Sequence, residues 1–164
     1  ASPALAARVV VTRSAEVARL ARAAGAKTIL HSLPGRNDTV RLGLDALLGE
    51  CPGLGGCIFL PGDQPLLRRE SLEAMVRGFR AQKETERVIL RLGWRTEGAE
   101  PLLGSPVLFG SGHFDALRAL PEGKGGGAVI RQNPGCVRAV YARSAEELED
   151  ADTVERLEAL KRFL

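Results

Sequence analysis

The chain has 164 residues, of which 45% are hydrophobic and 26% are charged, and its formal net charge is +3. This length and composition suffice for one folded domain with its own core and exclude a largely disordered chain. The basic residues are scattered and aromatic residues make up only 4%, whereas nucleic-acid binding calls for a clustered basic face or stacking aromatics.

The sequence gives no sign of a membrane or secreted protein. No apolar run approaches the length of a membrane-spanning helix, and the first residues lack the pattern of a signal peptide. Cys51, Cys57 and Cys136 are an odd number of cysteines without a Cys-x-x-Cys pair, which argues against a disulfide framework. We therefore expect a cytoplasmic protein without a membrane or nucleic-acid partner.

Short apolar runs predict six buried strands. They cover residues 8–12, 27–30, 56–60, 88–90, 106–109 and 136–141. Amphipathic helical patterns separate them and close the chain, over residues 14–24, 38–48, 71–79, 114–120, 128–131 and 153–163. This alternation predicts a single α/β domain over residues 1–164 with a mostly parallel sheet.

Particular residues should bound these helices. Ser14 is predicted to cap the first helix and Gly25 to end it, with Asp38 or Thr39 capping the second and Ser71 opening the third. The first helix is expected to bury an apolar face, and so is the last. These faces are Val17, Leu20, Ala21 and Ala24, and Val154, Leu157, Leu160 and Leu164.

The turn after the third strand is the first candidate for chemistry, because ligands of parallel sheets bind beyond the carboxyl ends of the strands. Gly62 permits the turn and Pro65 fixes its exit. Asp63 is thereby held at the sheet edge, where a carboxylate can ligate Mg²⁺ that bridges phosphates. An Asp that only caps its own backbone in the turn is the alternative.

A second acidic group precedes the last helix. Asp150 and Asp152 fall on the same side of an extended segment, so either could be a further metal ligand. Without further context, capping of the last helix by Asp150 or Asp152 is the favoured explanation.

Two loops could approach a ligand. Residues 35–39 lead into the second helix, whose N-terminus could hold an anion or a base edge, or could simply be capped. Residues 123–127 form a glycine-rich loop with Lys124, which could reach a phosphate or serve as a flexible connection. His31, His113 and the cysteines lack partners at ligand or catalytic spacing, which favours structural roles.

Four motifs together resemble the MobA-like nucleotidyltransferases. Residues 59–67 (Phe-Leu-Pro-Gly-Asp-Gln-Pro-Leu-Leu) are similar to the metal-binding strand and turn of that family, and residues 104–109 (Gly-Ser-Pro-Val-Leu-Phe) to its Gly-x-Pro-Val-x-Phe segment. Residues 123–126 resemble a Gly-Asp-Lys-Gly loop, and residues 147–153 the terminal Leu-x-Asp-Ile-Asp-Thr motif. The resemblance covers residues 8–164 and is greatest to molybdenum cofactor cytidylyltransferases.

Residues 36–44 are also similar to an Arg-x-Asp-Ser-Val-x-x-Gly-Leu stretch of methylerythritol phosphate cytidylyltransferases. The resemblance places Thr39 at a cytosine base, with Gly35 and Arg36 nearby. It also implies nucleotide contacts for Gly62 and Gln64, at the turn after the third strand.

The family resemblance implies a three-layer α/β/α sandwich of the nucleotide-diphospho-sugar transferase type. Its Rossmann-like sheet would be mostly parallel, with the strand at residues 105–109 antiparallel. These families also begin with a strand and a Gly-rich loop that supplies an Arg and a Lys to the triphosphate. Residues 1–164 hold no such loop, and residues 1–8 resemble the end of the family's first helix. We expect the natural chain to carry that strand and loop upstream.

The implied reaction is Mg²⁺-dependent transfer of CMP from CTP to a molybdopterin-type cofactor, with release of pyrophosphate. Asp63 and Asp152 would be catalytic metal ligands, with Asp150 as a further ligand, and Lys124 would approach the acceptor. A molybdoenzyme or its chaperone is a possible partner. A non-catalytic binding module, or an enzyme using another nucleotide or a sugar phosphate, is the alternative.

Overall fold

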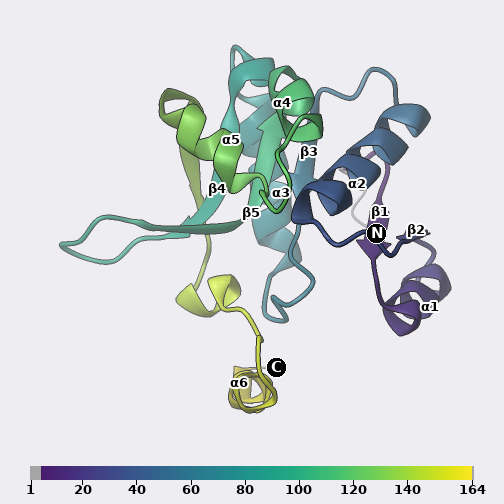
Figure 1. Cartoon of the computed structure of the whole chain (residues 1–164). Coiled ribbons are helices and arrows are strands. Elements are labelled where there is room, and N and C mark those ends of the chain that lie inside the picture. Colours follow the sequence, from purple (N-terminus) through teal and green to yellow (C-terminus); the bar gives the residue numbers. More distant parts are fainter. Residues whose placement is uncertain (1–4, 164) are drawn as a thin grey trace.

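The computed structural model describes residues 5–163 as strands alternating with helices (Figure 1). The strands are β1 (Val9–Thr12), β2 (Lys27–Leu30), β3 (Gly56–Phe59), β4 (Ile89–Trp94), β5 (Leu102–Gly110) and β6 (Val137–Tyr141). The α-helices are α1 (Ala15–Ala23), α2 (Arg36–Glu50), α3 (Arg69–Arg80), α4 (Phe114–Arg118), α5 (Gly127–Gln132) and α6 (Val154–Leu160). Short 3₁₀ turns lie at Thr85–Arg87, Ser111–His113, Pro134–Cys136, Ala145–Leu148 and Lys161–Phe163.

The strands form two sheets. β1 and β2 make a parallel pair, and the other four strands follow the order β3-β5-β4-β6. In the larger sheet β4 and β6 are parallel, whereas β5 is antiparallel to both of its neighbours. The predicted antiparallel strand at residues 105–109 is therefore confirmed, and it extends over the whole of β5.

Two apolar layers cover opposite faces of the larger sheet (Figure 1). On one face, Phe109 and Ile89 pack with Leu44 of α2, Leu117 of α4 and Val129 of α5. On the other face, alternate strand residues pack against α3, since neighbouring side chains in a strand point to opposite sides. This second cluster contains Met75, Val88, Leu90, Leu92, Leu108 and Ala142. The result is the three-layer α/β/α sandwich that the sequence predicted.

Two of the predicted helix starts are wrong by a few residues. Helix α2 begins at Arg36 with Gly35 as its N-cap, and the Asp38 carboxylate accepts the Gly35 N–H at 3.2 Å. Helix α3 begins at Arg69, so Ser71 lies in its first turn. Asp38 thus supports the N-terminus of α2 from inside the first turn, whereas the Ser71 hydroxyl donates to Glu147. Composition alone does not separate such first-turn positions from the cap. Ser14 does cap α1, accepting the Val17 N–H at 3.3 Å.

The apolar faces of the first and last helices are less buried than predicted. Val17 and Leu20 of α1 are 45% and 54% exposed, because the two-stranded sheet offers α1 a narrow surface that buries only Ala18. Helix α6 lies apart from the sheets (Figure 1), with Leu160 buried but Val154 71% exposed. Leu164 lies outside the described residues. Residues 1–8 were expected to resemble the end of the family's first helix. Residues 5–8 are not helical, and residues 1–4 lie outside the described part of the chain.

Among residues 5–163, no helix has the length and apolar character needed to cross a membrane.

Candidate active site

The carboxyl ends of β3, β4 and β6 lie at one edge of the larger sheet, because these strands share a direction. The turn after β3 brings Asp63 to this edge, with its side chain exposed. Pro61, two residues earlier, lines a cavity described below. Asp63 thus lies beyond the carboxyl end of β3, as predicted.

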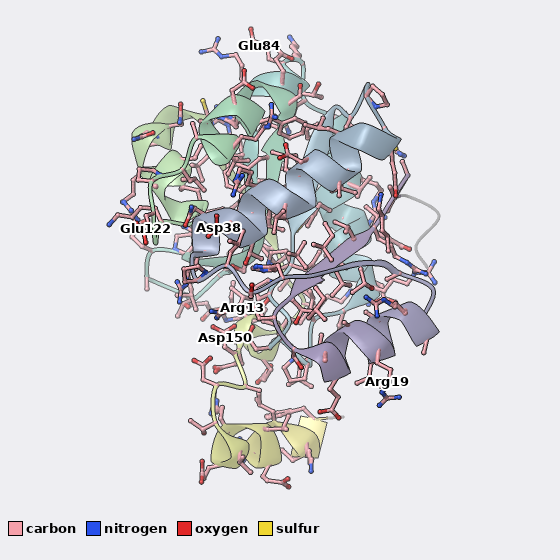
Figure 2. The ribbon with its side chains drawn as sticks, turned by 45° about the vertical axis from the view of Figure 1, so that its right-hand side comes forward. Arg13, Arg19, Asp38, Glu84, Glu122 and Asp150 are labelled. Carbon is pink, nitrogen blue, oxygen red and sulfur yellow. The ribbon has the colours of Figure 1, made fainter. Side chains whose placement is uncertain are left out.

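The segment before α6 comes to the same turn. The Ala151 N–H donates a hydrogen bond of 2.7 Å to the backbone carbonyl of Asp63. Asp150 and Asp152 flank Ala151, and both residues are exposed (Asp150 is labelled in Figure 2). Thr153 caps α6, and its hydroxyl accepts the Arg156 N–H at 3.1 Å. Neither aspartate is therefore the N-cap of this helix, and both remain available to a ligand.

The donors at this turn suit a hard cation that also binds phosphate. Carboxylate oxygens are the ligands that Mg²⁺ takes, and it commonly uses one or two of them beside substrate phosphates and water. Within residues 5–163, no group of three or more His, Cys, Asp or Glu residues gathers as a metal cage. Asp63 and Asp152 are two exposed carboxylates of the kind that Mg²⁺ shared with a substrate would use.

A cavity of about 370 Å³ lies next to this turn. Its walls come from α2, the end of β3, β5, α4 and the glycine-rich loop leading into α5. Its polar lining side chains are those of Arg36, Thr39 and Ser105. The remaining lining residues are Val40, Phe59, Leu60, Pro61, Val107, Phe109, Leu117, Gly125, Gly126, Gly127 and Ile130. A mostly apolar cavity with few polar groups is typical of a small-molecule site.

The start of α2 and the glycine-rich loop are joined at the cavity. The Gly123 N–H donates to the Asn37 side-chain oxygen at 3.1 Å. Figure 2 labels the residues next to this pair along the chain, Asp38 of α2 and Glu122 of the loop. Gly123 has φ of +72°, a conformation that favours glycine. A Cβ at Gly126 would lie 3.1 Å from the Phe109 ring. The loop therefore presents mainly backbone to the cavity.

The Thr39 side chain contacts His31. The Thr39 hydroxyl lies 3.4 Å from Nε2 of His31, which follows β2, while the buried Nδ1 of His31 has no partner among the described residues. This contact fixes the side of α2 that Thr39 presents. The structural role predicted for His31 agrees with this position.

The other predicted site residues lie outside the cavity lining. Lys124 is exposed, and its N–H donates to the Pro121 carbonyl at 3.0 Å. Gly62 is exposed in the Asp63 turn without a positive φ and with nothing within 4 Å of its Cβ position, so the prediction that the turn depends on a glycine there is wrong. Gly35 acts as the cap of α2. Gln64 is buried, and its amide nitrogen lies 3.5 Å from the Leu148 carbonyl. The structure thus gives Gln64 a supporting contact with the acidic segment.

The sequence interpretation missed several residues of this region. Ser105 lies within the recognised Gly-x-Pro segment, so its motif was visible although its place in the lining was not. Asn37 binds the glycine-rich loop from 86 residues away, and Glu147 is fully buried beneath the acidic segment. No local sequence pattern predicts a contact between residues so far apart in the chain.

The larger sheet thus contains one strand that runs against the other three, and acidic residues lie at its edge beside an apolar cavity. The chain belongs to the MobA-like NTP transferase domain family, whose sequence model matches residues 1–139. The predicted enzyme class, nucleotidyltransferase, is thereby confirmed. No curated protein matches the chain.

Solved structures share this fold at low sequence identity. Rv0371c from Mycobacterium tuberculosis H37Rv superposes with a TM-score of 0.69 at 20% identity, covering 94% of this chain and 74% of its own. A 4-diphosphocytidyl-2C-methyl-D-erythritol synthase gives 0.72 at 16% identity, with 98% and 83% covered. CMP:2-keto-3-deoxy-manno-octonic acid synthetase, complexed with CTP, gives 0.65 at 18% identity, with 97% and 80% covered.

Proposed function

We propose that the protein transfers CMP from CTP to a molybdopterin-type acceptor in a Mg²⁺-dependent reaction that releases pyrophosphate. The observation that carries this proposal is the 2.7 Å hydrogen bond between Ala151 and Asp63. It brings two acidic segments, 88 residues apart, to one sheet edge beside the cavity. Acidic residues beside a nucleotide-sized cavity are what a metal-assisted nucleotidyl transfer requires.

The cavity suits the nucleoside part of the substrate. Its apolar walls can pack against a base and ribose, while the Thr39 hydroxyl and the Arg36 guanidinium can donate hydrogen bonds to the acceptor atoms of cytosine. Two structurally similar proteins are named for cytidine chemistry, which supports CTP as the nucleotide. Gly35 keeps the start of α2 in place through its N–H to Asp38.

The reaction consists of an in-line displacement at phosphorus. An oxygen of the acceptor phosphate attacks the α-phosphorus of CTP, a new P–O bond forms, and the bond to the β-phosphate oxygen breaks as pyrophosphate leaves. A bound Mg²⁺ would supply neutralisation of the phosphate charge. The second pKa of a phosphate is about 6, so the nucleophile is already ionised near neutral pH and needs no side-chain base.

The chain's own residues contribute positioning and charge. Asp63 and Asp152 would hold the cation, and Asp150 would orient it or take the place of a ligand. Pro65 restrains the exit of the turn, and Lys124 on its exposed loop can reach the acceptor phosphate. Positioning and electrostatic stabilisation provide most of the rate in such transfers.

A nucleotide-panel assay of the full-length protein tests this function. Pyrophosphate release is measured with CTP, GTP, UTP and ATP, with Mg²⁺ and a molybdopterin-type acceptor. We expect turnover with CTP at least about tenfold above the other nucleotides, since one well-placed hydrogen bond can give about 1.4 kcal/mol. Turnover with another nucleotide would overturn the choice of CTP. Nucleotide binding without turnover in any combination would identify a non-catalytic binding module instead.

A further inference from the structure

A fully buried acid lies beneath the acidic segment. Glu147 is 0% exposed, and its carboxylate accepts three hydrogen bonds. Oε2 accepts the Ser71 hydroxyl at 2.5 Å and the Arg68 N–H at 3.2 Å, and Oε1 accepts the Arg143 N–H at 2.9 Å. A buried carboxylate is tolerated only when its oxygens are satisfied in this way.

The Glu147 carboxylate caps the N-terminus of α3 in place of an N-cap side chain. The N-cap residue of this helix is Arg68, whose side chain makes no capping bond. In a capping box, a carboxylate of the first turn accepts the N-cap N–H; here that carboxylate comes from a residue 79 positions away. The negative charge also lies at the positive end of the helix dipole. The turn at Ala145–Leu148 is thus fixed to the start of α3.

The next contacts along the chain lead from Glu147 to the cation ligands. The Leu148 carbonyl lies 3.5 Å from the Gln64 amide nitrogen, and the Leu148 side chain packs on Gly104, where a Cβ would lie 2.8 Å from it. Three residues later, Ala151 donates to the Asp63 carbonyl. The segment between Glu147 and Asp152 is therefore fixed at its start by one carboxylate and at its end by one backbone bond.

We propose that Glu147 is a positioning residue that sets the place of Asp150 and Asp152 relative to Asp63. The role in catalysis rests on the proposed function, because it concerns the acids that would hold Mg²⁺. Glu147 itself is buried and does not contact a substrate. Its loss would release the acidic segment from α3 and let Asp152 move away from the turn.

Hydrogen exchange in the full-length protein tests the structural part directly. In Glu147→Gln, the amide NH₂ faces backbone N–H donors, so at least one of the three bonds is lost. We expect the Ala151 N–H to exchange at least about tenfold faster, while amides of β4 and β5 keep their wild-type rates. Glu146→Gln is the control, because it removes the same charge from the neighbouring residue. An unchanged Ala151 rate in a folded Glu147→Gln protein would overturn the proposal.

A milder variant keeps the test decisive if Glu147→Gln does not fold. Ser71→Ala removes one donor and leaves the carboxylate in place, so we expect a smaller but measurable acceleration at Ala151. Unchanged exchange at Ala151 in that variant would overturn the proposal in the same way.

Kinetics test the catalytic part. We expect Glu147→Gln to raise the Mg²⁺ concentration for half-maximal rate about 10- to 100-fold, as for residues that orient metal ligands, with little change in KM for CTP. Val88→Ala truncates a core side chain directly before β4, at the edge of the sheet away from Asp63. It controls for lost stability and should leave the Mg²⁺ concentration for half-maximal rate unchanged. An equal effect of both variants would overturn the positioning role. Absent turnover in the wild type would contradict the proposed function, while the exchange result would still decide the positioning of the segment.

Discussion

The Asp63 carboxylate faces solvent, while the carbonyl of the same residue is used by Ala151. Asp63→Asn should therefore preserve the turn and this backbone bond but lose the charge that attracts a hard cation. We expect kcat for pyrophosphate release to fall by about two orders of magnitude or more, with an unchanged melting temperature. Asp115→Asn, at an exposed position of α4, is the control. Turnover of Asp63→Asn within a few-fold of wild type would show that Asp63 is not a ligand.

Thr39 offers a test of base recognition at a single hydroxyl group. Thr39→Val keeps the shape of the side chain but removes the hydroxyl that lies 3.4 Å from His31 and lines the cavity. A lost hydrogen bond of about 0.5–1.5 kcal/mol should raise KM for CTP about two- to twelvefold and leave kcat nearly unchanged. Steady-state kinetics with CTP and UTP measure this change and the selectivity between the bases. An unaltered KM would place the base elsewhere.

At the scale of elements, the end of β5 packs backbone to backbone against the Thr85–Arg87 turn. A Cβ at Gly110 would overlap the carbonyl oxygen of Thr85. Gly110→Ala should therefore destabilise the protein by about 1–3 kcal/mol, seen as a lower midpoint in urea unfolding. Gly49→Ala is the matched control, because Gly49 lies in α2 with nothing within 4 Å of its Cβ position. That variant should gain about 0.5–1 kcal/mol. Equal midpoints for the two variants would contradict this account.

Most elements could be predicted from the sequence because their signals are local. The β-branched run at 9–12 and the Ser14 cap with Gly25 beyond it determine β1 and α1 within a few residues. The antiparallel direction of β5 came from the family resemblance, since no pattern within residues 102–110 encodes direction. The burial of α1 and α6 was overestimated because amphipathicity shows which face is apolar but not whether a partner covers it.

In the candidate site too, some features have local sequence signals and others do not. The prediction of Asp63 and Asp152 rests on their place after or before a recognisable element, and that of the 35–39 segment on its place before a helix; their roles stay predictions. The bonds of Asn37 to Gly123 and of Glu147 to Ser71 join residues 86 and 76 positions apart. Only the folded chain brings such residues together, so no spacing in the sequence could reveal them.

At the scale of the whole molecule, the reactivity of the buried Cys57 thiol shows whether the core is folded. Burial raises the pKa of this thiol from 9.0 to about 12. At pH 8 about one Cys57 in ten thousand is then a thiolate, so iodoacetamide should modify the partly exposed Cys51 and Cys136 but leave Cys57 intact until the protein unfolds. Peptide mass spectrometry with and without denaturant measures this. Native modification of Cys57 at the rate of Cys136 would disprove it.

The same thiol gives the stability a pH dependence with a definite sign. An unfolded Cys57 ionises near pH 9.0, whereas the folded thiol stays protonated up to about pH 12. Its contribution is thus fully present below pH 9 and is lost as the pH rises toward 12. Urea unfolding at pH 8 and pH 10 should show lower stability at pH 10, and Cys57→Ala should reduce that difference. An equal difference in both proteins would contradict the assignment to this thiol.

Helix α2 packs on both sheets at once. Leu44 belongs to the core of the larger sheet, while Gly43 approaches Val11 of β1 so closely that a Cβ would lie 3.1 Å from it. Its Thr39 faces the cavity and also contacts His31 at the end of β2. We therefore expect a ligand that immobilises Thr39 to slow the exchange of β1 amides, and unchanged exchange on nucleotide binding would refute this. Because binding linkage is reciprocal, slower exchange would also mean that holding β1 and β2 together strengthens nucleotide binding.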